Sequence, residues 1–214
     1  MTIVARLLLT RPAGQEAELA ELLRRAGHSV VHVPLIAIEP LGDEPIDVAG
    51  YDWVVITSVN GARELRRRAV GLMPRVAAIG AATAHAFGAA DLVPRVSTQE
   101  GLLAELPRPA GRVLFAGAES ARRVLADELD ADVVALYRTR ELAVAELPPV
   151  DLAVLASPSA ARSFARAGGT APAVTIGPET SRATRGAGIV VAAEAATHDL
   201  PGLVDAVAAA VAGR

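Results

Sequence analysis

Residues 52–63 read DWVVITSVNGAR, and an altered copy, DLAVLASPSAAR, occupies residues 151–162. Each copy joins an acidic residue, an apolar run of strand length and a group of small polar residues. This order is typical of a buried strand whose end opens into a loop and then a helix. Parallel α/β sheets place their ligand sites at such points. The pair therefore predicts an α/β fold with two related strand–loop–helix units.

The segments around the two copies repeat as well. Ser58 precedes Ser157 by 99 residues and Gly80 precedes Gly177 by 97, so the period is nearly half of the 214 residues. Such a long period indicates two similar α/β units and not a solenoid. Strands are also expected at residues 6–10, 29–33, 75–80, 92–96, 111–117, 133–139, 173–177 and 189–192. Strands that alternate with helices predict parallel sheets with right-handed crossovers.

Two proline-containing segments interrupt this alternation. Residues 38–45 hold two prolines, a glycine and several acids, and residues 142–149 contain Pro148 and Pro149. We interpret both segments as linkers. On the helix that follows the first copy, Arg66, Arg67 and Arg68 are expected to form a solvated face.

Composition excludes several classes of function. The chain contains no lysine and no cysteine, which excludes lysine Schiff bases, Walker-type lysines, disulfides and thiolate chemistry. Aromatic residues make up 3% and the net charge is −3, so binding of nucleic acid is disfavoured. The four histidines are scattered, and no metal site is expected. Because residues 1–6 lack a signal-peptide pattern and no apolar run reaches about 18 residues, we expect a cytoplasmic protein that does not enter a membrane.

Six short motifs, in this order, resemble the uroporphyrinogen-III synthase family. None is specific alone, but their order covers nearly the whole chain. They are LTRP (9–12), ITSVNG (56–61), AIG with Thr83 (78–80), LYRT (136–139), SPSA (157–160) and IGPET (176–180).

The resemblance implies a domain map that differs from two consecutive halves. One domain would comprise residues 1–37 plus 140–214, and the other residues 42–136. Both would be flavodoxin-like parallel-sheet domains. Two extended linker strands, near residues 34–41 and 137–142, would join them, and the substrate cleft would lie between the domains.

The resemblance also implies a reaction. Members of the family are cyclising hydro-lyases of porphyrin, tetrapyrrole and heme biosynthesis. They close linear hydroxymethylbilane with loss of water and inversion of ring D. The pyrroles themselves supply the nucleophile, so positioning of the two chain ends accounts for much of the acceleration. The implied protein is a monomer without a cofactor that receives its substrate from hydroxymethylbilane synthase.

A site without lysine must hold the substrate carboxylates with arginines and with N–H groups at helix N-termini. Glycines are candidates because they let strand-to-helix turns approach an anion closely, and hydroxyl and amide side chains are candidates because they are neutral donors that also cap helices. The candidate substrate-binding residues are Arg11, Thr57, Ser58, Asn60, Gly80, Thr83, Gly117, Arg138, Ser157, Ser159, Gly177 and Thr180.

Tyr137 is the candidate catalytic residue, because it matches the tyrosine of the family's interdomain segment. As a phenol it would act as a general acid that helps the substrate hydroxyl to leave as water. The alternative for this side chain is a strand-end tyrosine that packs with its hydroxyl in water.

One other class of function stays open at this point. A two-lobed α/β chain without an evident catalytic triad also fits a non-catalytic, hinge-type binding or sensor module for a small anionic ligand. The isolated glycines do not form the G-x-G-x-x-G pattern, so a nucleotide is disfavoured as that ligand.

Overall fold

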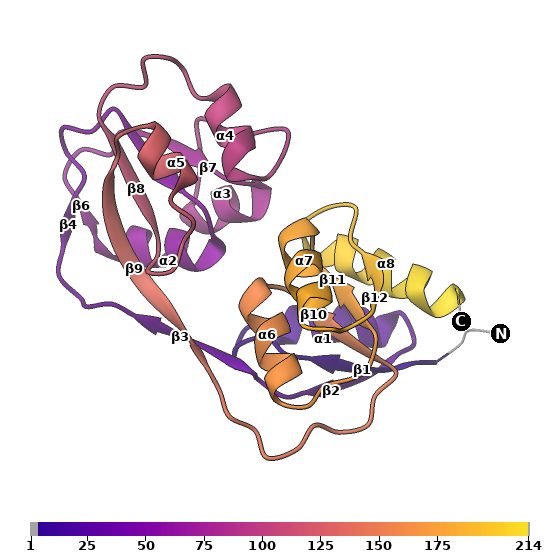
Figure 1. The fold of residues 1–214 in the computed structure, drawn as a ribbon. Coiled ribbons are helices and arrows are strands. Elements are labelled where there is room, and N and C mark those ends of the chain that lie inside the picture. Colours follow the sequence, from indigo (N-terminus) through magenta and orange to yellow (C-terminus); the bar gives the residue numbers. More distant parts are fainter. Residues whose placement is uncertain (1–3, 214) are drawn as a thin grey trace. The chain divides into compact units, whose positions relative to one another are not determined.

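The computed structural model describes residues 4–213, and the chain divides into two compact units (Figure 1). Unit 1 consists of Met1–Ala37 and Arg140–Arg214, and unit 2 consists of Ile38–Thr139. Each unit has a five-stranded sheet. The expectation of an α/β fold with parallel sheets is confirmed.

The sheet of unit 1 has the order β12-β11-β10-β1-β2, and all of its neighbouring strands are parallel. Numbered within the unit, this is the 2-1-3-4-5 order of flavodoxin-like sheets. The strands are β1 (Arg6–Leu9), β2 (Ser29–His32), β10 (Leu152–Leu155), β11 (Ala173–Thr175) and β12 (Val191–Glu194). The helices are α1 (Ala17–Arg25), α6 (Pro158–Arg166), α7 (Pro178–Gly186) and α8 (Leu200–Ala212).

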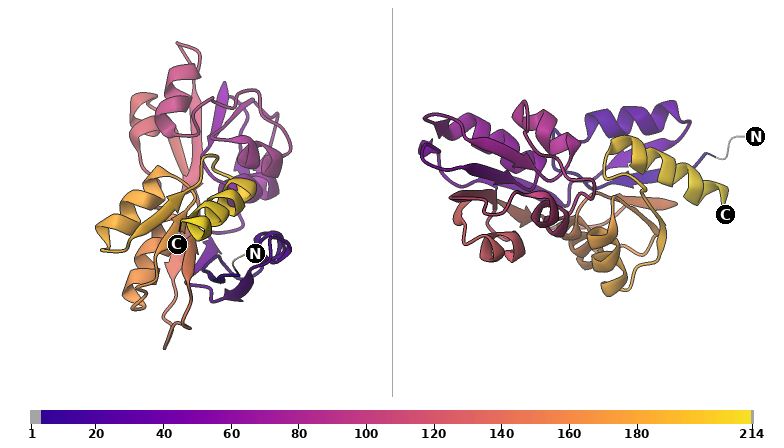
Figure 2. Two further views of the ribbon diagram at one scale, coloured as in Figure 1. Left: turned by 90° about the vertical axis from the view of Figure 1, so that its right-hand side faces the viewer. Right: turned by 90° about the horizontal axis from the view of Figure 1, so that it is seen from above.

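Alternation along the strands of unit 1 gives the sheet two buried faces. Leu7 and Leu9 pack in one core with apolar residues of α1 and α8, and Leu8 packs in a second core with Ala161 and Phe164 of α6. The right-hand view of Figure 2 shows indigo α1 and yellow α8 on one side and the orange helices on the other. Burial on both faces explains why these strands read as continuous apolar runs.

The sheet of unit 2 has the order β3-β9-β8-β5-β7. Strands β9, β8, β5 and β7 are parallel. Leu142 donates to the Leu35 carbonyl and Leu41 to the Leu136 carbonyl, so β3 pairs with β9 in the antiparallel sense. The strands are β3 (Ile36–Pro40), β5 (Trp53–Ile56), β7 (Arg75–Ala78), β8 (Val113–Ala118) and β9 (Asp132–Glu141).

Helices cover both faces of this sheet too. The helices are α2 (Val59–Arg68), α3 (Ala81–Phe87), α4 (Gln99–Glu105) and α5 (Val124–Glu128). Val54 and Ile56 pack in one core with α2 and α3, whereas Trp53 and Val55 pack in the other with α4 and α5. A separate two-stranded parallel sheet pairs β4 (Ile46–Asp47) with β6 (Ala69–Val70).

The sequence repeat is visible in matching contacts at the start of β5 and β10. The Asp52 carboxylate accepts from the Arg112 N–H at 2.8 Å, beside the start of β8. The Asp151 carboxylate accepts from the Arg6 N–H at 2.7 Å, at the start of β1. Each acid of the repeated motif thus fastens its strand to the neighbouring strand of its own unit.

Two local expectations are wrong. The strand expected at residues 92–96 is only an isolated parallel bridge between Leu92 and Ala77, because Pro94 lacks the N–H that a continued ladder needs. Arg68 is not part of a solvated face. Its side chain is buried and donates to the Leu41 and Glu44 carbonyls, each at 2.9 Å, which anchors the segment after β3.

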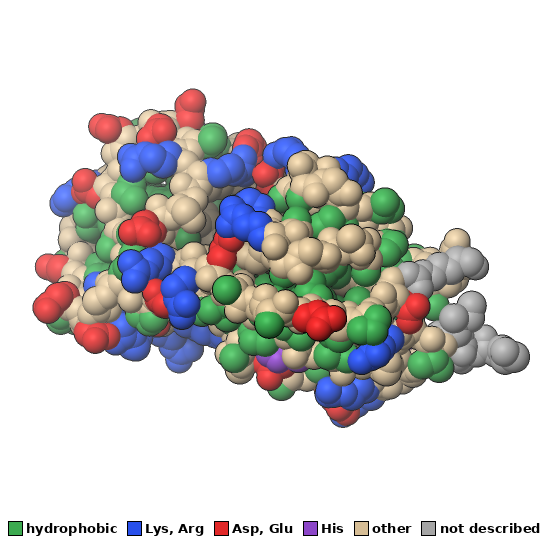
Figure 3. Space-filling view, turned by 60° about the horizontal axis from the view of Figure 1, so that its bottom comes forward, with side chains coloured by type: hydrophobic (Ala, Val, Ile, Leu, Met, Phe, Trp, Pro, Cys, Tyr) green, Lys and Arg blue, Asp and Glu red, His purple; other side chains and the backbone are tan. Residues whose placement is uncertain are grey.

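Charged side chains of both signs are intermixed on the face drawn in Figure 3. None of the helices in the described part of the chain is both long and apolar enough to cross a bilayer.

Candidate functional site

The strand orders define one switch point in each sheet. In unit 1 it lies between β1 and β10, and in unit 2 between β5 and β8. Ligands of doubly wound proteins bind beside such points, at the carboxyl ends of the strands. Most candidate residues predicted from the sequence lie on, or just after, the carboxyl ends of strands in one unit or the other. Tyr137 and Arg138 lie inside β9, where Tyr137 pairs with Ala118 at the carboxyl end of β8.

Ser58 organises the loop between β5 and α2. It is the N-cap of α2, and its hydroxyl oxygen accepts from the Gly61 N–H at 3.0 Å. The same oxygen lies 2.9 Å from the Tyr137 hydroxyl. Thr57 and Asn60 flank Ser58 and are half-buried. Ser58 therefore joins a helix N-terminus to the candidate catalytic phenol.

Tyr137 is held by burial as well as by this hydrogen bond. It belongs to the core under α2 and is only 6% exposed. Burial raises the pKa of Tyr137 above its ordinary value, and the hydrogen bond with Ser58 offsets part of that rise. The phenol is thus protonated at neutral pH. The alternative of a hydroxyl in open water does not describe this side chain.

Arg138 follows Tyr137 on β9 and is exposed. Its Nε donates to a Glu39 carboxylate oxygen at 2.9 Å, an ion pair between β9 and β3. A substrate carboxylate that bound Arg138 through a fork including Nε would displace Glu39.

Gly117 is not at a strand-to-helix turn as expected. It lies inside β8, and α5 begins only at Val124. A Cβ at Gly117 would lie 3.2 Å from the Phe115 ring and 3.4 Å from the Thr57 hydroxyl, and one at Gly61 would lie 3.7 Å from the Gly117 Cα. Any larger residue at position 117 would crowd the Phe115 ring and the Thr57 hydroxyl at the switch point.

The β7–α3 loop brings Gly80 and Thr83 to the same edge of unit 2. Gly80 is the N-cap of α3 in an extended conformation, and Thr83 in the first turn is buried. A Cβ at Gly80 would lie 3.1 Å from the Ser97 hydroxyl, so the position is tight but its backbone needs no left-handed conformation.

In unit 1, Ser157 plays the part that Ser58 plays in unit 2. It caps α6 and accepts from the Ala160 N–H at 3.1 Å. Its second partner is the Ser159 hydroxyl at 3.0 Å. Both serines are half-buried, so this loop presents two small hydroxyls.

The β11–α7 loop of unit 1 contains Gly177 and Thr180. Gly177 is the N-cap of α7, and a Cβ there would lie 2.8 Å from Nε2 of His198. Thr180 is buried, and its carbonyl accepts from the Thr184 hydroxyl at 2.7 Å. The exposed His198 ring thus lies beside the helix N-terminus, a proximity that the sequence did not indicate.

Arg11 lies in the loop after β1. Its Nε donates to the Gln15 carbonyl at 2.8 Å, and its own carbonyl lies 2.8 Å from Nε2 of His32. A carbonyl can only accept, so Nε2 of His32 is the donor. Glu16 lies 3.9 Å from the other ring nitrogen of His32. Hydrogen bonds from backbone N–H groups, first its own, lower the pKa of the Glu16 carboxyl below its ordinary value.

His32 and Glu16 were not predicted from the sequence. A histidine at the end of a strand gives no local signal, because its partner Arg11 lies 21 residues away. The structure gathers the candidates of unit 1 at one sheet edge and those of unit 2 at another. No cluster of three or more potential metal ligands among His, Cys, Asp and Glu occurs within residues 4–213.

The two edges offer similar chemistry. Each presents the N-termini of helices that follow adjacent strands, where N–H groups and the helix dipole favour anions. Each adds serine and threonine hydroxyls, and each unit contributes an arginine. Unit 2 alone adds a buried phenol. Such edges suit a ligand with several carboxylates.

These features define a duplicated, doubly wound α/β protein with hydroxyl-capped helices at both switch points. The profile of the family described as uroporphyrinogen-III synthase HemD matches residues 17–205. The chain belongs to this family.

Relatives extend the match. A uroporphyrinogen-III synthase of Synechococcus elongatus is 30% identical over 136 residues, which make up 55% of this chain and 52% of that protein. A relative from Archaeoglobus fulgidus is 34% identical over 144 residues, 64% of this chain and 62% of that protein. The chain thus spans between half and two thirds of the length of these curated relatives.

A solved structure supports the fold. The crystal structure of a mutant uroporphyrinogen III synthase from Thermus thermophilus matches with a TM-score of 0.61 at 15% identity, over 98% of this chain and 99% of that chain.

Proposed function

We propose that the chain catalyses the uroporphyrinogen-III synthase reaction. It closes linear hydroxymethylbilane into a ring, with loss of water and inversion of the terminal pyrrole. Family membership supports the choice of reaction. The hydrogen bond between Tyr137 and the helix cap Ser58 is the observation that supports assigning the reaction to particular residues.

In this proposal the substrate supplies its own nucleophile. The terminal carbon–oxygen bond breaks, and the hydroxyl takes a proton and leaves as water. The distal pyrrole attacks the electron-poor carbon left behind through its substituted position, which gives a spiro intermediate. The bond between this pyrrole and the rest of the chain then breaks and re-forms at the unsubstituted position, which inverts the ring, and the proton released there returns to the acid. Tyr137 acts as the general acid, and Ser58 either orients its proton or passes it on. General-acid assistance typically contributes 10²–10⁴-fold. The remainder comes from holding the two ends of the chain close together.

The substrate carboxylates bind at the carboxyl ends of the strands in both units. We assign this binding to Thr57, Ser58, Asn60, Gly80, Thr83, Gly117 and Arg138 in unit 2, and to Arg11, Ser157, Ser159, Gly177 and Thr180 in unit 1. The two edges would bind one substrate in a cleft between the units. The two-stranded linker near residues 34–41 and 137–142 would act as a hinge.

The proposal includes a monomeric enzyme that works in the cytoplasm on substrate released by hydroxymethylbilane synthase. Light scattering at micromolar concentration tests the monomer. A mass of two chains would contradict it.

The decisive experiment is an isomer assay. Freshly made hydroxymethylbilane is incubated with the protein, and the oxidised porphyrins are separated by chromatography. We expect the inverted isomer, because spontaneous closure gives the uninverted one. If folded protein yields only the uninverted isomer, the chain is instead a binding or sensor module for an anionic ligand.

A further inference from the structure

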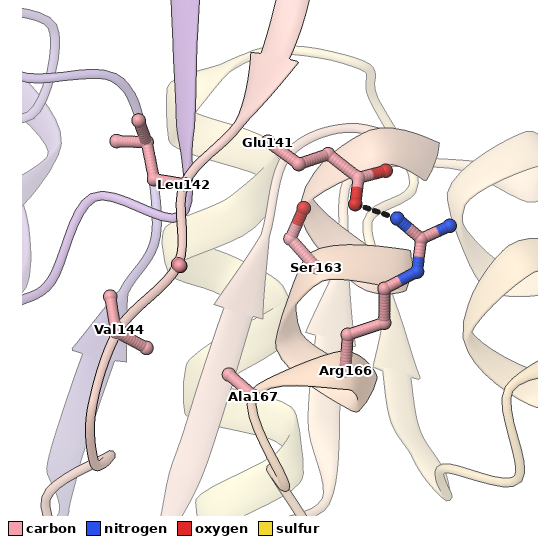
Figure 4. Close-up of a pocket in the computed structure, with 7 residues that line it drawn as sticks. Glu141, Leu142, Val144, Ser163, Arg166 and Ala167 are labelled. Carbon is pink, nitrogen blue, oxygen red and sulfur yellow. Dashed lines mark hydrogen bonds and ion pairs between the residues drawn. The ribbon is translucent and has the colours of Figure 1, made fainter.

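A hollow of about 320 Å³ lies in unit 1 beside the second half of α6 (Figure 4). Its size is at the lower end of small-molecule sites. The end of β9 and the segment after it form one wall, and α6 forms the other. The lining residues are Glu141, Leu142, Ala143, Val144, Ser163, Arg166 and Ala167.

Ser163 is the uncharged polar residue in the lining of this hollow. It is 3% exposed, and its hydroxyl has no hydrogen-bond partner among the described residues. Figure 4 shows the hydroxyl directed from α6 toward the space below Glu141. Burying a hydroxyl without a partner costs free energy, so buried hydroxyls are normally paired. Alanine would avoid this cost, which makes the serine a sign of a partner that enters from outside.

Charges of both signs flank this hydroxyl. Glu141 accepts a hydrogen bond from Arg166, and this contact joins one guanidinium nitrogen to one carboxylate oxygen. A guanidinium has five N–H donors and a carboxylate accepts about four hydrogen bonds. The side chain of Arg166 is 67% exposed and that of Glu141 29%. The pair therefore retains donors and acceptors for a molecule that has both charges close together.

The remaining walls are aliphatic. Leu142, Val144 and Ala167 line the hollow opposite and below the ion pair. They suit a short hydrocarbon side chain and offer no partner for a second polar group.

This hollow is separate from the sheet edge of unit 1. Ser157 caps the start of α6, and Arg166 is its last residue. At about 1.5 Å per residue, the two ends of this helix lie about 12 Å apart.

We propose that this hollow is a binding site for a small α-amino acid with an aliphatic side chain. The carboxylate of the ligand binds Arg166, its ammonium group binds Glu141, and Ser163 donates to the carboxylate. Adjacent charges on the ligand match the direct contact between the two side chains. The aliphatic side chain lies against Leu142 and Val144.

Titration calorimetry with L-leucine tests the proposal without any tetrapyrrole, so its outcome is independent of the isomer assay. The matched compounds are 4-methylpentanoate, which lacks the amine, and 3-methylbutylamine, which lacks the carboxylate. We expect leucine to bind at least about tenfold more tightly than either compound, because each loses a charged hydrogen bond.

Variants locate the site. Arg166→Gln and Ser163→Ala are expected to weaken leucine binding about tenfold or more. Arg162→Gln removes an exposed arginine from the same helix outside the lining and is expected to leave binding within about twofold. Far-UV circular dichroism verifies that each variant is folded.

Two results would overturn the proposal. One is no heat from leucine up to millimolar concentration, which would mean that water alone satisfies Ser163. The other is equal weakening by Arg162→Gln and Arg166→Gln, which would place the binding elsewhere.

Discussion

The serine caps of the two switch-point loops have nearly the same backbone conformation but different hydroxyl partners. Ser58 has φ −162° and ψ 154°, and Ser157 has φ −163° and ψ 157°. Both cap a helix by accepting from the N–H three residues later. The second partner differs: Ser58 bonds to the buried phenol of Tyr137, whereas Ser157 bonds to its neighbour Ser159.

The strands beside the loops differ in the same way. Trp53 pairs with Val113 in unit 2, and Leu152 pairs with Leu7 in unit 1. Four residues further along, β8 has Gly117 where the chain after β1 has Arg11. Glycine at position 117 leaves room for the Phe115 ring and the Thr57 hydroxyl, and arginine at position 11 adds a cation.

The comparison indicates a division of labour. Both units of the duplicated fold have a serine helix cap at the switch point. Unit 2 has a buried phenol beside its cap, and unit 1 has small hydroxyls and a guanidinium. In the proposed reaction, unit 2 therefore assists the departure of water, and unit 1 only binds.

Substitution of the two caps, Ser58 and Ser157, is expected to give the largest difference in free energy of unfolding between the two units. Ser58→Ala loses a cap worth about 1 kcal/mol and leaves the buried Tyr137 hydroxyl unpaired at a cost of about 1–3 kcal/mol. Ser157→Ala loses the cap, about 1 kcal/mol, and its bond to Ser159, which is only half-buried and therefore has access to water. Urea unfolding measures the loss in free energy of unfolding for both variants. The fluorescence of Trp53, the single tryptophan, reports on unit 2. Equal losses would contradict the comparison.

A double-mutant cycle between Ser58→Ala and Tyr137→Phe isolates the hydroxyl contact. The double variant leaves no hydroxyl unpaired. Its loss in free energy of unfolding should therefore be smaller than the sum of the two single losses by about 1 kcal/mol. The same cycle on Ser58 and Tyr51 is the control, because Tyr51 bonds to Asp132 at 2.9 Å instead. Additive costs for the Tyr137 cycle would mean that the contact contributes nothing.

The pKa of Tyr137 gives a smaller signal with a defined sign. The chain has two tyrosines, so Tyr51→Phe leaves Tyr137 as the only phenol. Tyrosinate absorbance should show a pKa above the ordinary value, and adding Ser58→Ala should raise it further. The pKa of Tyr137 is higher in the folded than in the unfolded protein. The contribution of the protonated phenol to the stability of the fold is therefore complete below the unfolded pKa, and it is lost as the pH rises through the folded pKa. An unshifted titration would show that the phenol is in water.

Ser159→Ala is expected to have the smallest effect. Ser159 is half-buried and bonds to Ser157, which keeps its cap contact with Ala160. The free energy of unfolding should change by no more than about 0.5 kcal/mol. A loss as large as that of Ser157→Ala would show that the two hydroxyls act as one unit.

The sequence predicted the α/β class and the cap at Ser58, because both depend on local pattern. Thr83 and Thr180 are not caps, since the N-caps of α3 and α7 are Gly80 and Gly177. Apolar runs of four residues, each followed by a small hydroxyl, predict a strand that opens a helix wherever they occur. The strand at residues 92–96 failed because an apolar run does not reveal the missing N–H of Pro94. The burial of Arg68 was missed because its acceptors, the carbonyls of residues 44 and 41, lie 24 and 27 residues earlier in the sequence.

The contacts that shape the candidate site were less accessible from sequence. Ser58 and Tyr137 are 79 residues apart in the sequence. They meet because the strand order places β9 and β5 on either side of the single strand β8. Strand order depends on long-range packing, which no local pattern encodes. Gly117 was predicted for backbone freedom, and the structure instead gives it a packing role.

The most direct test of the central claim is the rate of ring closure by Tyr137→Phe, measured beside Tyr51→Phe, which removes the other phenol of the chain. Loss of general-acid assistance predicts that turnover falls about 10²-fold for Tyr137→Phe. Inversion of the terminal ring should persist, because the assigned carboxylate-binding residues are unchanged. Tyr51→Phe should stay close to the wild-type rate, because Tyr51 bonds to Asp132 and is not among those residues. A wild-type rate for folded Tyr137→Phe would contradict the division of labour between the two units.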